Sequence, residues 1–116
     1  MYQVISDQHD YLAVKFTGKV DKEEYQEILA NLTSKTETGN QVDLLVDLTE
    51  LERFTMGALW EDIKFDVKNF KVIRRLAIIG DRNTIKILDP ISKPFVTDEA
   101  KFFEKSDYKE AQKWVH

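Results

Sequence analysis

The stretch Val42–Leu48 constrains the fold most strongly, because its pattern is that of a buried strand. Successive side chains of an extended chain point to opposite faces. One face would be fully apolar: Val42, Leu44, Val46 and Leu48. The other would carry Asp43, Leu45 and Asp47. Since a strand covered on both faces is usually a continuous apolar run, the two aspartates predict that the second face of the sheet is less covered.

An amphipathic helix is predicted after this strand, over residues 55–70. Thr55 is a typical N-cap residue, and apolar residues then recur with the helical period. They are Leu59, Ile63, Val67 and Phe70. A buried strand, a short connection and an amphipathic helix together predict an α/β domain.

The length and charge of the chain limit the classes of protein to which it can belong. At 116 residues with 42% hydrophobic content, we expect one domain over residues 1–116, which can bury about two-thirds of its unfolded-chain surface. The net charge of -4 disfavours nucleic acid and anionic membranes as partners. The absence of cysteine excludes disulfides, thiolate catalysis and cysteine-ligated metal centres.

Neither a signal peptide nor an apolar segment of membrane length is recognisable in the sequence, and both would show as long apolar runs. We therefore expect a cytoplasmic protein without an integral membrane segment.

Strands and helices are predicted to alternate along the rest of the chain. Residues 2–6 and 11–18 form a hairpin around a turn at residues 7–10. Asp21 caps a helix that ends near Gly39. A strand over residues 72–81 pairs in parallel with Val42–Leu48, residues 83–88 form a short irregular connection, and residues 99–103 form the last strand. Ser106 then caps a terminal helix whose inward residues are Tyr108, Ala111, Trp114 and Val115.

The resulting order, β-β-α-β-α-β-α-β-α, predicts a mixed five-stranded sheet with right-handed parallel crossovers. If consecutive strands lie side by side, the crossover helices cover mainly one face of the sheet.

The chain resembles the STAS-like domains, specifically the SpoIIAA-like group of small bacterial proteins, over nearly its full length. Besides the order of elements, five local patterns carry the resemblance. They are the strand Leu45–Leu48 with the helix start Thr55–Leu59, Trp60-Glu61-Asp62, the strand end Ala77–Asp81, Phe102-Phe103, and the tail Ala111–Val115. The resemblance implies a STAS/SpoIIAA-like fold.

The resemblance also implies two kinds of function. Anti-anti-sigma STAS proteins carry a regulated serine in an Asp-Ser-Ser-Gly motif, where phosphate switches partner binding. This chain has Phe54-Thr55-Met56-Gly57 there, so Met56 takes the place of the serine and we expect no serine phospho-switch. SpoIIAA-like proteins are also similar to lipid-carrying folds with an apolar pocket between helix and sheet.

Several polar residues are candidates for a site. Thr55, Met56, Gly57 and Arg53 could form an anion site at a helix start, although a plain N-cap is the more common role of threonine. Acidic side chains are expected to gather at the carboxyl end of the Val42–Leu48 strand, where open α/β sheets bind ligands. They are Asp43, Asp47, Glu50 and Glu52. His9 and His116, the only histidines, are expected to be solvated and to form no metal site, because such sites need three or four ligands.

The sequence favours a non-enzymatic regulatory or protein-interaction module without a cofactor or metal, with a protein partner or a homodimer. The candidate binding residues are Thr55, Met56, Gly57, Arg53, Trp60 and Asp47. The alternative is a carrier or sensor of a small apolar or amphipathic ligand in a cavity between the Leu59–Phe70 helix and the sheet. A third hypothesis, an enzyme that uses Asp47 and Glu50, has no identifiable base or nucleophile to support it.

Overall fold

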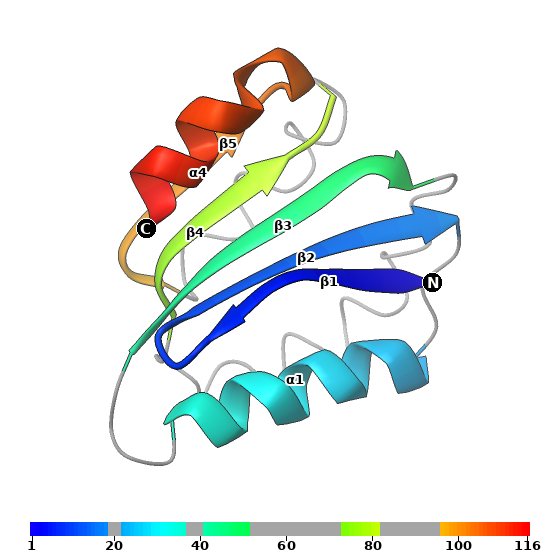
Figure 1. Ribbon diagram of the computed structural model, residues 1–116, viewed down its shortest axis with the longest axis vertical. Helices are drawn as coiled ribbons and strands as arrows, with labels where there is room; N and C mark the ends of the chain where they lie inside the picture. The colour runs from blue at the N-terminus through cyan, green and yellow to red at the C-terminus, as the bar shows by residue number, and fades with distance from the viewer. Residues whose placement is uncertain (19–21, 37–40, 52–72, 82–95) are drawn as a thin grey trace.

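The computed structural model describes residues 1–18, 22–36, 41–51, 73–81 and 96–116, which form five strands and two α-helices (Figure 1). The elements are β1 (Tyr2–Gln8), β2 (Tyr11–Gly18), α1 (Lys22–Thr36), β3 (Val42–Leu51), β4 (Ile73–Ile79), β5 (Val96–Phe103), a 3₁₀ turn at Lys105–Asp107, and α4 (Tyr108–Val115). The predicted helix over residues 55–70, the connection at 83–88, the cap Asp21 and the stop Gly39 lie outside the described residues.

The strands form one mixed sheet in the order β1-β2-β3-β4-β5. β1 and β2 form the predicted antiparallel hairpin, and β2, β3, β4 and β5 are parallel to their neighbours. The predicted parallel pairing of β3 with β4 is confirmed, with Val46 opposite Ile78. The predicted five-stranded mixed α/β sheet is therefore the observed fold class.

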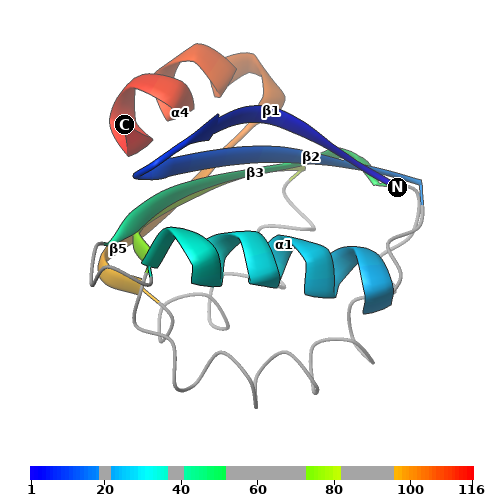
Figure 2. The same ribbon diagram turned by 60° about the horizontal axis from the view of Figure 1, so that its bottom comes forward.

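α1 covers one face of the sheet, as Figure 2 shows. Ile28 and Leu32 of α1 are buried against apolar residues that alternate along β2, β3 and β4. These strand residues are Leu12, Val14, Phe16, Val42, Leu44, Leu48, Ile73, Leu76 and Ile78. The predicted apolar face of β3 is thus the face beneath α1, which burial of apolar area stabilises.

α4 covers the opposite face, which corrects the expectation that this face is less covered. Ala111 and Val115 of α4 pack in one buried cluster with Leu45 and Ala77 of the sheet. Leu45 is fully buried, and Asp43 and Asp47 beside it are also buried. The expectation was wrong because it considered only crossover helices, whereas α4 follows the last strand and is free to return over the other face.

Several element boundaries differ from the sequence prediction, among them the end of β3 at Leu51 rather than Leu48. β1 extends to Gln8, so the hairpin turn is shorter than residues 7–10. The last strand begins at Val96 rather than at Glu99. The predicted cap Ser106 is wrong, because it lies inside the 3₁₀ turn; Glu104 precedes this turn in an extended conformation, and neither terminus has a side-chain cap. No helix among the described residues is long and apolar enough to span a membrane.

Trp114 of α4 contacts residues of β4 and β5. The Nη1 of Arg75 donates a 2.9 Å hydrogen bond to the Trp114 carbonyl oxygen. The Arg75 guanidinium lies 5.6 Å and the Lys101 Nζ 5.4 Å from the indole centroid, and the Phe103 ring packs against the indole at 5.8 Å. Both cations are close enough for a cation–π interaction.

Trp114→Ala is expected to lower the free energy of unfolding by about 1–2 kcal/mol. This is less than the roughly 3–5 kcal/mol of a fully buried aromatic residue, because Trp114 is only partly buried. Urea denaturation followed by far-UV circular dichroism measures the change. Trp114→Phe keeps a ring for both cations and should lose less; an equal loss would show that the cation–π contacts contribute nothing.

Candidate functional site

Of the six predicted site residues, the described part of the chain contains Asp47. Thr55, Met56, Gly57, Arg53 and Trp60 lie outside it. Oδ1 of Asp47 accepts hydrogen bonds from the backbone N–H of Thr49 at 2.9 Å and from its hydroxyl at 2.6 Å. Asp47 therefore shapes the end of its own strand, as aspartate side chains commonly do at strand ends and turns.

The environment of Asp47 extends to α4 and β2. Burial raises the pKa of Tyr108, the charge of Asp47 raises it further, and Lys15 opposes them. Lys15 also forms a 3.2 Å ion pair with Glu50. The acidic side chains at this end of β3 thus have local partners.

Asp43 does not join Asp47, which corrects the predicted acidic cluster. Asp43 is the second residue of β3 and lies near its amino end. Four residues of strand separate two side chains by about 13 Å, so one ligand ion could not contact both carboxylates. Glu52 lies outside the described residues.

Asp43 instead forms a two-point ion pair with Arg74 of β4. Nε and Nη2 of Arg74 donate hydrogen bonds of 2.9 and 2.7 Å to the two carboxylate oxygens. The side chain of Asp43 is only 4% exposed, whereas that of Arg74 is 47% exposed. Burial opposes ionisation of Asp43, but the hydrogen bonds from Arg74 and His116 outweigh it and hold its pKa below the ordinary value of 3.8.

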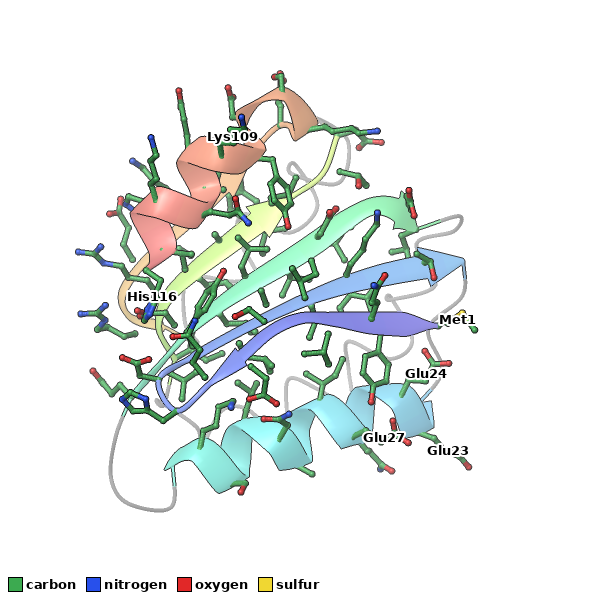
Figure 3. All side chains as sticks on the ribbon, viewed as in Figure 1. Met1, Glu23, Glu24, Glu27, Lys109 and His116 are labelled. Atoms are coloured by element: carbon green, nitrogen blue, oxygen red, sulfur yellow. The ribbon has the colours of Figure 1, made fainter. Side chains whose placement is uncertain are left out.

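His9 and His116 approach the same carboxylate. Nε2 of His9 lies 3.8 Å and Nε2 of His116 3.7 Å from the oxygens of Asp10. His116 also stacks on Tyr11, with ring centroids 4.6 Å apart and planes 8° from parallel, and its Nδ1 lies 3.4 Å from Asp43. Both histidines are exposed, as expected, and His116 in addition lies against Tyr11 and Asp43 at one end of the sheet (Figure 3).

A polar pocket of about 300 Å³ lies beside these residues. Its lining residues are His9, Asp10, Gln41, Asp43 and Arg74. Asp43 and Arg74 neutralise each other. Among the described residues, no group of three or more histidine and acidic side chains is arranged to hold a metal ion. Sequence reasoning missed this pocket because its residues come from three separate segments; the aspartate in an apolar strand was its one signal.

Exposed apolar side chains gather on the edge strand β1. Among the described residues, the large exposed hydrophobic side chains are Met1, Val4 and Ile5, at 72%, 43% and 40% exposure. β1 has no neighbour on its outer side. Edge strands normally carry charges that prevent pairing with another chain. The other edge strand, β5, has exposed Glu99 and Lys101, but the apolar centre of β1 has no such charge.

The one ionised side chain of β1, Asp7, is already paired with α1. Lys35 donates a hydrogen bond to Asp7 Oδ1, and Asn31 donates one of 3.2 Å to Oδ2. Hydrogen bonds from Lys35 and then Asn31 lower the pKa of Asp7. Sequence reasoning missed this surface because the alternation that predicts a strand does not tell whether it lies at the edge or at the centre of the sheet.

Comparison with known proteins gives a family and similar solved structures. The family model described as SpoIIAA-like matches residues 11–116. The crystal structure of an uncharacterised protein of the DUF3478 family with a SpoIIAA-like fold, from Shewanella loihica, is similar to this chain. The two are 30% identical with a TM-score of 0.70, over 100% of this chain and 93% of the other. No curated protein matches the chain.

Proposed function

The chain belongs to the SpoIIAA-like family, and on this premise we propose that it is a non-enzymatic regulatory module that acts by binding another protein chain at the open edge of its sheet. The observation that carries this proposal is the exposure of Val4 and Ile5 on β1. An edge strand with unpaired backbone groups and exposed apolar side chains is a template for strand addition, in which the backbone supplies affinity and the side chains supply specificity.

The pairing of the polar side chains supports a binding role over catalysis. Asp43 is paired with Arg74, and Asp47 with Thr49. A catalytic carboxylate needs access to a substrate and a pKa matched to its task. The lowered pKa of Asp43 keeps it ionised and paired with Arg74, which suits a structural ion pair.

A photo-crosslinking amino acid at Gln3 tests the proposal in the native cells. Gln3 lies on β1 and is exposed, so we expect it to capture a protein chain. The same probe at Gln112, exposed on α4, is the matched control and should not capture that chain.

The captured chain is then purified and its binding is measured directly. Ile5→Asp should weaken binding at least about tenfold, or 1.4 kcal/mol, because it places a carboxylate in the apolar centre of the contact. Gln112→Asp adds the same charge elsewhere and should have no effect. Equal affinity for the Ile5→Asp variant and the unchanged chain would overturn the proposal.

The alternative function is that of a carrier of a small apolar ligand. Its predicted cavity involves Leu59–Phe70, which lies outside the described residues, and the pocket at the end of the sheet is lined by polar residues. Native mass spectrometry of gently purified protein should therefore give the mass of the chain without a bound lipid. A copurifying lipid would favour the carrier over the interaction module.

Thr55 is expected to act as a helix cap rather than as a phospho-switch, a prediction that rests on the sequence alone. Glu50 and Glu52 precede it and would oppose a phosphate, with Arg53 as the compensating charge. Thr55→Glu should leave partner binding unchanged, as measured by the same binding assay. Phosphate found at Thr55 in protein from native cells, together with loss of binding by Thr55→Glu, would support the anti-anti-sigma mechanism instead.

A further inference from the structure

The bulge in β1 gives this strand a symmetric pattern of faces. Val4 lies opposite Val14 and Ser6 opposite Ala13, so Ile5 is one extra residue in β1. Without a bulge, Tyr2 and Asp7 would point to opposite faces. With the bulge, they lie opposite Phe16 and Leu12, which both belong to the α1 face.

The same symmetry holds for Gln3 and Ser6. They lie opposite Lys15 and Ala13, on the face that α4 covers. For the two pairs Tyr2 with Asp7 and Gln3 with Ser6, the face is therefore the same when β1 is followed from either end, about a centre between Val4 and Ile5. A contact between two identical surfaces requires such self-complementarity, because residue i meets j and residue j meets i.

We propose that the protein chain bound at β1 is a second copy of this chain, with the two β1 strands antiparallel and their sheets joined into one. This inference rests on the proposed function and names its partner. Val4 of each copy then lies opposite Ile5 of the other. Gln3 lies opposite Ser6, and Tyr2 opposite Asp7. Directly opposite residues share a face in antiparallel strands, which the symmetric pattern of faces permits.

The charges beside β1 are complementary in this arrangement. Tyr2 donates a 2.6 Å hydrogen bond to Glu27 at one end of β1, and Lys35 binds Asp7 at the other end. Figure 3 shows Glu27 close to the Met1 end. Because Tyr2 lies opposite Asp7 of the second copy, Glu27 of each copy lies toward Lys35 of the other.

The same arrangement keeps like charges apart. The two Asp7 side chains lie at opposite ends of the contact, so they do not face each other. A parallel arrangement would instead bring Asp7 beside Asp7 and Glu27 beside Glu27, which like-charge repulsion disfavours. The charges therefore select antiparallel pairing with a second copy.

Two cysteine variants test the register directly, because the chain contains no cysteine of its own. Opposite residues in antiparallel strands have Cα atoms about 4.5–5.5 Å apart, within the range that a disulfide bridges. An equimolar mixture of the Gln3→Cys and Ser6→Cys proteins with oxidised glutathione should therefore give a covalent dimer containing one of each. Intact-mass spectrometry identifies this mixed dimer.

Each variant alone is the matched control. Two Gln3→Cys chains would place their cysteines three residues apart along the strands, about 10 Å, beyond the limit of about 7 Å for a disulfide. Neither variant alone should form a covalent dimer. A dimer formed by Gln3→Cys alone, or none from the mixture, would overturn the proposed pairing.

Sedimentation velocity separates failure of this inference from failure of the proposed function. The unchanged chain and Gln112→Asp should show a dimer fraction that rises with concentration, and Ile5→Asp should be monomeric with an unchanged circular dichroism spectrum. A chain that stays monomeric overturns the inference. If the probe at Gln3 of such a monomer still captures a different protein, and Ile5→Asp weakens that binding, the proposed function stands without the second copy. If the probe captures no protein, both the inference and the proposed function are overturned.

Discussion

Replacing Leu45 by alanine is expected to lower the free energy of unfolding by about 2–5 kcal/mol, the usual cost of truncating a fully buried leucine. Leu45 has no exposed surface and packs in the cluster formed by the sheet and α4. The substitution removes apolar contacts and leaves a cavity that the neighbouring strands cannot easily fill. Chemical denaturation at constant protein concentration measures the loss.

Val4→Ala is the control for this experiment, because it also shortens an apolar side chain of the sheet. Val4 is 43% exposed in the single chain, and at a protein concentration low enough to keep the chain monomeric a surface substitution usually changes stability by no more than about 0.5 kcal/mol. A small effect of Leu45→Ala, close to that of Val4→Ala, would contradict the packing of α4 over this face.

Arg74→Ala is expected to cost about 2–3 kcal/mol at neutral pH. Removing one partner of a buried ion pair costs about 3–5 kcal/mol; the expected value is lower because the Arg74 side chain is half-exposed and water screens its charge. The cost arises at Asp43, whose nearly buried carboxylate loses two hydrogen bonds. Arg82→Ala, which removes the same type of side chain outside the pair, is a control for loss of positive charge.

The contribution of Asp43 to the pH dependence of stability should be smaller in this variant. In the unchanged chain the pKa of Asp43 is lowered from 3.8, so its contribution is present above about pH 4 and is lost as the pH falls below that value. Without Arg74, the pKa of Asp43 is higher than in the unchanged chain, because the hydrogen bonds and charge of Arg74 that lower it are gone, while burial still raises it and His116 still lowers it. Asp43 then contributes less stability at neutral pH, and the loss caused by the substitution grows as the pH rises through the pKa of Asp43.

Urea denaturation between pH 3.5 and about pH 7, a range that spans the ordinary pKa of a carboxyl group, distinguishes these two slopes. The informative quantity is the difference in unfolding free energy between the two proteins, because other carboxylates titrate in both. This difference should grow with pH. A difference that stays constant over the range would show that Arg74 does not control the ionisation of Asp43.

Local patterns were sufficient to predict most of the described elements. The alternation in residues 11–18 and 42–48 and the apolar end of β4 identify strands, because each strand buries one or both faces and the pattern of apolar residues reflects that burial. The consecutive order of the strands agrees with the tendency of strands that follow each other in sequence to lie side by side. Ser106 failed as a cap because side-chain type alone does not decide whether the chain enters a helix directly or through a 3₁₀ turn.

The candidate sites were not predictable in the same way. Asp43 is paired with Arg74, and His116 with Asp43 and Tyr11, across 31, 73 and 105 positions of sequence respectively, so no local pattern records these contacts. The predicted residues around Thr55 lie outside the described residues, so their roles remain predictions.

The sequence by itself determined most of the residues of β1, β2, β3 and β4 that become strands and the residues of α4 that face the sheet, since burial of apolar side chains acts at the period of each element. The tertiary structure alone decided that α4 lies over Leu45 and that β1 is an open edge. It also decided that one extra residue at Ile5 brings Tyr2 and Asp7 to the same face. These features depend on which strand lies beside which, and pairing between distant segments is a property of the whole sheet rather than of any one segment.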